Sequence, residues 1–130
     1  MEETVLFEDK KWATLAHLSV FTGFIIPFGS IIAPIIIWTS KRELPLTVDQ
    51  CKEVLNFQIS TFIYFVVLLV AFILSVISSS HYEPDLASII IIGLLVVALG
   101  IYYLVATVIG ALQANNGVRY RYAINIRFIK

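Results

Sequence analysis

The residues Leu46–Ile77, LTVDQCKEVLNFQISTFIYFVVLLVAFILSVI, decide the fold of this chain. The stretch begins with charged and amide side chains and continues without a break into an apolar run. From Phe57 to Ile77 it carries no charge, and at ~1.5 Å per residue that run crosses a hydrocarbon core of ~30 Å. We therefore predict a helix that starts at the membrane interface and becomes a full span.

Side chains at the start of this helix form a capping pattern. Pro45 ends the preceding segment, and Thr47 is a good N-cap residue. Gln50 stands three residues later, as in a capping box, and Asp49 suits the positive end of the helix dipole. The pattern predicts that the helix begins at Thr47 and satisfies its own first N–H groups.

Composition excludes a soluble globular domain. Of 130 residues, 59% are hydrophobic and 14% are charged, against ~25% charged in ordinary soluble domains. The net charge is zero, so no basic field indicates a nucleic-acid partner. The single cysteine, Cys51, excludes an internal disulfide framework, and neither a metal nor a cofactor is expected.

The first apolar segment, Trp12–Trp38, is interrupted by Pro27, Gly29 and Pro34. As one span it would be long and sharply kinked. As two helices it would be a hairpin whose arms reach ~22 and ~16 Å, which is short for a bilayer but allowed where neighbouring protein covers the backbone. We favour the hairpin and keep the kinked span as the alternative.

The distribution of basic residues predicts the topology. Lys41, Arg42 and Lys52 follow the first apolar segment, and further arginines follow the last one, whereas residues 78–87 contain neither Lys nor Arg. By the positive-inside rule, residues 1–11 and the C-terminal tail then lie in the cytoplasm of a bacterial inner membrane. A single kinked first span would put the N-terminus outside.

The last span is expected at residues 86–114. Small residues recur along it at spacings that allow close helix packing, namely Gly93, Gly100, Ala106, Gly110 and Ala114. They could serve a homo-oligomer, a membrane-protein partner or packing against the chain's own spans.

The tail, residues 118–130, alternates apolar and polar residues with a period of two, which predicts a short strand-like cationic segment. Its arginines and tyrosines suit phosphate headgroups of membrane lipids or a protein partner. These residues are Arg119, Tyr120, Arg121, Tyr122 and Arg127. Anchoring of the last span and strand pairing with Thr4–Phe7 are the alternatives.

Three polar residues, His17, Asn56 and Gln58, are predicted to form an intramembrane cluster that joins helices. A proton relay would need a carboxylate beside His17, and a zinc site from His17, Cys51 and Glu53 has no supporting spacing. No catalytic residue stands out, and we expect no enzyme. A small transporter or channel with a polar path along the three residues is the alternative.

Several motifs carry a family resemblance. They are Trp12-Ala13-x-x-Ala16-His17-Leu18, Glu53-x-x-Asn56-Phe57-Gln58 and Ala114-Asn115-Asn116-Gly117. With them the chain resembles domain-of-unknown-function family 4870 of small bacterial membrane proteins. That family is distantly similar to the twenty-kilodalton subunit of the chloroplast inner-envelope import translocon. The resemblance implies four helices with both ends on one side, and a role in protein translocation or in a membrane complex.

We therefore predict a single all-helical membrane domain of four helical segments. A hairpin at residues 12–38 precedes an interfacial helix and span at 46–77, the last span at 86–114 and the tail at 118–130. The expected function is that of a non-enzymatic helper or structural subunit.

Overall fold

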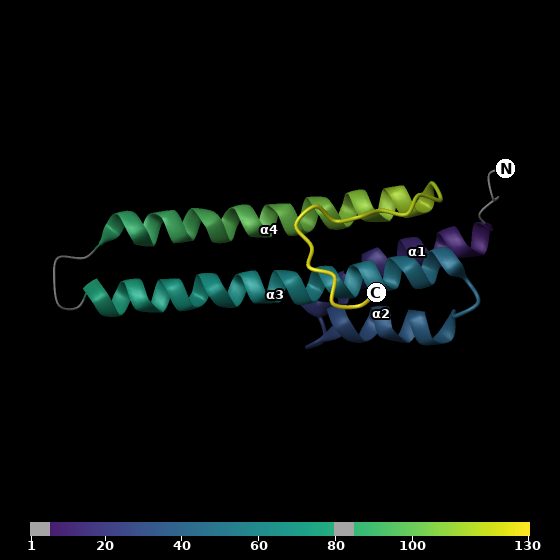
Figure 1. Ribbon diagram of the computed structural model, residues 1–130, viewed down its shortest axis with the longest axis horizontal. Coiled ribbons are helices and arrows are strands. Elements are labelled where there is room, and N and C mark those ends of the chain that lie inside the picture. Colours follow the sequence, from purple (N-terminus) through teal and green to yellow (C-terminus); the bar gives the residue numbers. More distant parts are fainter. Residues whose placement is uncertain (1–5, 80–84) are drawn as a thin grey trace.

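The structure of the protein is a computed structural model that describes residues 6–79 and 85–130. In these ranges the chain forms α1 (Phe7–Leu18), a short 3-10 helix η1 (Ser19–Phe24), α2 (Gly29–Ser40), α3 (Pro45–Ser79) and α4 (Leu86–Asn115). They contain no β-strand. Figure 1 shows α3 and α4 side by side along the long axis, with α1 and α2 packed at one end. The predicted all-helical fold of four helical segments is confirmed.

Two helices, α3 and α4, are long and apolar enough to cross a membrane. The 35 residues of α3 extend for ~52 Å at ~1.5 Å per residue, well beyond a ~30 Å hydrocarbon core. Its first turns therefore lie outside the hydrocarbon, as the charged start of the sequence indicated.

The N-terminal segment is a helical hairpin, as predicted, and not one kinked span. Phe28 turns the chain with a left-handed backbone, φ 62°, which a bulky residue seldom adopts. Next to it, Gly29 approaches η1 so closely that a Cβ there would lie 2.7 Å from Thr22 Oγ1. The first helix begins at Phe7, earlier than Trp12, and Pro34 is accommodated inside α2.

The start of α3 differs from the capping prediction. The helix begins at Pro45, and the free N–H groups of Leu46 and Thr47 donate to the two carboxylate oxygens of Asp9, at 2.9 and 2.7 Å. Thr47 Oγ1 also donates to Asp9 Oδ1. The cap is therefore a carboxylate supplied by α1, which suits the positive end of the α3 dipole. The capping prediction was wrong because it used only residues close in sequence to the helix start, whereas the cap comes from Asp9.

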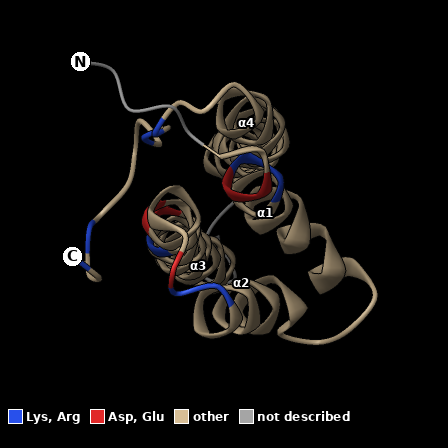
Figure 2. Cartoon of the chain, turned by 90° about the vertical axis from the view of Figure 1, so that its right-hand side faces the viewer, with Lys and Arg blue, Asp and Glu red and all other residues tan. Residues whose placement is uncertain are grey.

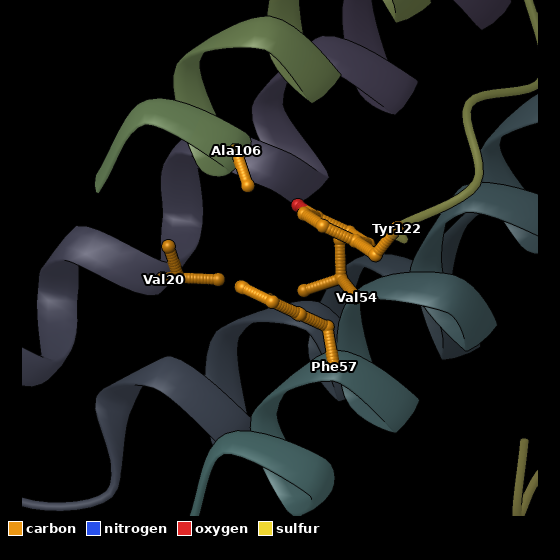
Figure 3. Close-up of a cluster of buried hydrophobic side chains, with 5 residues drawn as sticks. All are labelled: Val20, Val54, Phe57, Ala106 and Tyr122. Atoms are coloured by element: carbon orange, nitrogen blue, oxygen red, sulfur yellow. The ribbon is translucent and has the colours of Figure 1, made fainter. Parts of the chain in front are cut away.

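The buried core lies where α1, the first half of α3, the end of α4 and the tail meet, a region we call the junction. Val20, Val54, Phe57, Ala106 and Tyr122 form its main apolar cluster, shown in Figure 3. The rings of Phe57 and Tyr122 stack face to face, with centroids 3.9 Å apart. The junction is thus closed by a residue of the tail.

Beyond the junction, α3 and α4 continue as a two-helix pair, which the N-terminal hairpin borders near residues 61–65 and 96–104. We call residues 61–78 of α3 and 86–105 of α4 the bare pair. Their large apolar side chains are mostly exposed, for example Val67 at 60% and Leu94 at 65%. Exposure of this kind is expected of helices that are solvated by lipid.

The tail, residues 118–130, is not a strand, so that part of the prediction was wrong. It runs irregularly from the end of α4 across to α3 (Figure 1). In the proposed pairing with Thr4–Phe7, residues 4 and 5 lie outside the described residues. So do residues 80–84 of the loop that lacks basic side chains.

Candidate functional site

A stripe of polar side chains on α3 binds the tail. Asp49, Glu53, Asn56 and Ser60 follow one another at intervals of three or four residues, which places them on one face of the helix. Glu53, Asn56 and Ser60 are almost fully buried. Because buried polar groups need partners, this face requires a complementary segment beside it.

The tail supplies these partners mainly with its backbone. The N–H of Tyr122 donates to Glu53 Oε1 at 2.9 Å, and the N–H of Ile126 donates to Ser60 Oγ at 2.9 Å. Asn56 accepts from the N–H of Ile129 at 2.7 Å and donates to the carbonyl of the same residue at 2.8 Å. Side chains of α3 thus form the hydrogen bonds to the tail backbone that a neighbouring strand would otherwise form.

The arginines of the tail pair with carboxylates of α3. Arg121 donates to both oxygens of Asp49 at 2.8 Å, and Arg119 lies 3.7 Å from the same carboxylate. Arg127 Nε is 3.5 Å from Glu53 Oε2. In the end-on view of Figure 2 the tail passes from α4 to the side of α3. Headgroup or partner contact by these arginines stays a prediction.

The imidazole of His17 occupies the centre of the junction. Gln50 Oε1 accepts the backbone N–H of Tyr120 at 3.2 Å, which fixes the orientation of this amide. His17 Nε2, 2.8 Å from the same oxygen, must therefore donate. In the neutral ring, His17 Nδ1 then accepts from the Tyr122 hydroxyl at 2.7 Å, so these contacts select a single tautomer.

Burial accounts for the charge state of His17. The ring is fully buried, and desolvation lowers the pKa of His17 to about 4, against the opposing effects of Gln50 and Glu53. Burial likewise raises the pKa of the Tyr122 phenol. Both groups stay neutral at ordinary pH, as a structural hydrogen-bond chain requires.

The structure does not join His17, Asn56 and Gln58 into one cluster. His17 contacts Gln50 and Tyr122, and Asn56 contacts the tail. Gln58 lies on α3 near the bare pair, where its Oε1 accepts from the Tyr103 hydroxyl at 3.1 Å. A continuous polar path along the three residues therefore has no support in this arrangement.

The small residues of α4 divide between the two regions. Ala106, Gly110 and Ala114 are buried in the junction, and a Cβ on Gly110 would lie 2.7 Å from His17 Nδ1. Gly93 and Gly100 lie in the bare pair, where a Cβ would meet nothing within 4 Å. Packing of these two glycines against a second chain stays a prediction.

Two functional contacts were missed from the sequence. Asp9 caps α3 from another helix, and Gln50 joins His17 to the tail. The helical spacing of the polar residues on α3 could have indicated these contacts, since it predicts a polar helix face that must be covered by another segment. Nothing in the sequence indicated that the tail is that partner.

Comparison with known proteins assigns the family. A search of curated proteins and a search of solved structures gave no match. A family model matches residues 8–129, nearly the whole chain, and it describes the magnetosome magnetite crystal formation proteins, MamF/MmsF. The resemblance to domain-of-unknown-function family 4870 and to the import translocon is thereby corrected, and a translocation role has no support. The chain belongs to the magnetosome magnetite crystal formation protein family.

Proposed function

We propose that this protein is a non-enzymatic structural subunit of a bacterial membrane complex, and that the complex serves the formation of magnetite crystals. The family supplies the biological setting. The division of the molecule into a closed junction and an exposed apolar pair supplies the physical argument.

The polar side chains of the junction are engaged with one another. Asp49 and Glu53 are held by arginines of the tail, and His17 is held between Gln50 and Tyr122. These contacts fix the tail and the helices in place. They favour a role in architecture over a role in chemistry.

The observation that carries the proposal is the exposed apolar surface of the bare pair. Side chains such as Phe62, Val67 and Leu94 are 60–66% exposed. In a bilayer these faces contact either lipid or another membrane protein, and Gly93 adds a flat position where a partner helix can approach closely. A subunit that docks through α3 and α4 would use this surface.

The proposal includes an orientation in which the junction and the tail lie in the cytoplasm. The basic residues near the end of α2 and in the tail support it. In Figure 1 the start of α1, the turn between α2 and α3 and the start of the tail lie at the same end of the molecule, and the tail runs back from there along α4. With Cys51 replaced by Ser, Lys130→Cys and Asp85→Cys should react with impermeant maleimide from opposite sides of the membrane.

The subunit role is tested by photo-crosslinking in cells. A photoreactive amino acid at Val67 or Leu94 should capture a defined membrane protein at native expression. The matched control is Ile124, which is 56% exposed in the tail. Capture of protein at Ile124 but not at Val67 or Leu94 would place the partner on the tail, and lipid adducts alone would contradict the subunit role.

The role in magnetite crystal formation is tested by a separate experiment. In a magnetosome-forming bacterium that lacks its own family member, the chain should restore crystal dimensions as measured by electron microscopy. Deletion of residues 118–130 should abolish the rescue, because the tail completes the junction. Unchanged crystals upon expression of the intact, membrane-inserted chain would contradict a role in crystal formation.

A further inference from the structure

An apolar groove lies between the N-terminal hairpin and the bare pair. It has a volume of about 850 Å³ and is lined by η1, α2, α3 and α4. Phe24 and Phe28 line it from the hairpin side, Phe62 and Phe65 from α3, and Val97 and Gly100 from α4. We call it the hairpin groove. Its volume is within the range of small-molecule sites.

One polar group at this groove lacks a partner. Gln58 lines the groove and is 7% exposed. Its Oε1 is engaged by Tyr103, but its Nε2 has no hydrogen-bond partner among the residues that the structure describes. Because a buried amide N–H without an acceptor is unfavourable, the groove is expected to receive a molecule that carries an acceptor at this point.

The depth of Gln58 identifies the kind of acceptor. Beyond it, α3 continues through the uncharged residues 59–77 for about 29 Å at ~1.5 Å per residue, which matches the hydrocarbon core. Gln58 therefore lies at one boundary of that core, where the ester carbonyls of phospholipids are found. Phe62 and Phe65 stand one and two helical turns farther in, along the path that an acyl chain takes.

We propose that the hairpin groove binds one acyl chain of a membrane phospholipid, whose ester carbonyl accepts a hydrogen bond from Gln58 Nε2. The apolar walls contact the methylene chain, and the amide recognises the ester at the boundary. This inference goes beyond the subunit role and stands without it. The bound lipid fills the hairpin groove and so contacts both the hairpin and the two long helices.

Two glycines of α4 give a matched test of the groove. A Cβ at Gly100 or at Gly93 would meet nothing within 4 Å, so leucine is tolerated at both positions. Only Gly100 is one of the groove's lining residues. Gly100→Leu should therefore fill the groove and lower lipid occupancy at least fivefold, whereas Gly93→Leu should leave it unchanged.

The experiment uses the full chain, delipidated in mild detergent and titrated with dioleoyl phosphatidylglycerol or its diether analogue. Native mass spectrometry counts the bound lipids. The protein should bind one lipid and prefer the diester about fivefold, since the diether lacks the carbonyl acceptor. Gln58→Met should remove this preference, and Tyr103→Phe, which leaves Nε2 in place, should keep it.

Every other result overturns the proposal. Unchanged lipid occupancy in both Gly100→Leu and Gly93→Leu would mean that lipid binds elsewhere. An equal loss of lipid in both variants would indicate general binding to the bare pair. Equal binding of diester and diether would remove the role of Gln58. Displacement of a co-purifying protein by Gly100→Leu, with lipid unchanged, would identify the occupant as a protein helix. Circular dichroism confirms that each variant is folded.

Discussion

The two regions of this molecule are built from the same two helices but held together by different forces. In the junction, α3 presents buried polar side chains, and α1 and the tail satisfy them. In the bare pair, the same helix presents exposed apolar side chains. Because lipid gives apolar helices no drive to associate, the fold of this protein is specified mainly by the junction, through both its buried polar contacts and its apolar cluster.

The largest effect is expected at Glu53, which is 3% exposed and pairs with tail backbone and arginine. Glu53→Leu should destabilise the protein by about 3–5 kcal/mol, because it leaves buried donors without an acceptor. Thermal unfolding in detergent measures the loss, and trypsin should cleave the tail faster. Glu8→Leu, which removes an exposed ion pair with Lys41, should cost less than about 1 kcal/mol.

A second test uses pH. The folded protein holds the pKa of His17 at about 4, below its ordinary value of 6.5. Between these values the unfolded chain binds a proton that the folded chain refuses, so stability is complete above pH 6.5 and falls as pH drops toward 4. The loss should total about 3 kcal/mol at the lower limit. The titratable groups around the His17 ring in the folded protein include Glu53, Tyr120 and Tyr122.

The matched control for this titration is His17→Gln, which lacks the titrating ring. Its stability should vary less than that of the parent protein between pH 6.5 and 4. Parallel curves for the two proteins would show that carboxylates, and not His17, carry the acid sensitivity.

A third pair compares glycines of α4 in the two regions. Gly110→Leu should cost about 2–3 kcal/mol, because the added carbons collide with His17. Gly93→Leu should be neutral or stabilising by up to about 1 kcal/mol, since it gains helix propensity in open space. Equal effects at the two sites would mean that Gly93 also packs against protein, for example against a second copy.

The smallest difference is expected for valines of α3. Val54 is fully buried and Val67 is 60% exposed. Val54→Ala should cost about 1.5–2 kcal/mol, and Val67→Ala less than about 0.5 kcal/mol. Denaturation of both variants in the same detergent checks this ratio. A larger loss at Val67 would reveal an unseen partner on the bare pair.

Sequence reasoning predicted the parts of the fold that depend on local pattern. The length of the run after Phe57 indicated the span, and the interruptions between Pro27 and Pro34 indicated the hairpin. It did not predict the Asp9 cap or the path of the tail, because both depend on residues far apart in the chain. Asp9 and Thr47 are 38 positions apart, and His17 and Tyr122 are 105 apart.

The candidate site was predicted only in part. His17 was expected to bond an amide, and it does, but the amide belongs to Gln50 rather than to Asn56 or Gln58. The alternation of the tail indicated a strand because a period of two is that of a strand, whose backbone pairs with a neighbouring strand. A helix with polar side chains at the right spacing meets the same need, and periodicity alone does not distinguish the two.

The order of synthesis gives the tail a further consequence. Residues 118–130 leave the ribosome after both spans. Until the tail is synthesised, Glu53, Asn56 and Ser60 lack the backbone groups that they bind in the folded protein. During this interval the inserted helices resemble the separate, lipid-solvated pair at the other end. Completion of the junction therefore follows the synthesis of both spans. A membrane protease that recognises unpaired polar helices would distinguish a chain truncated before Gly117 from an intact one.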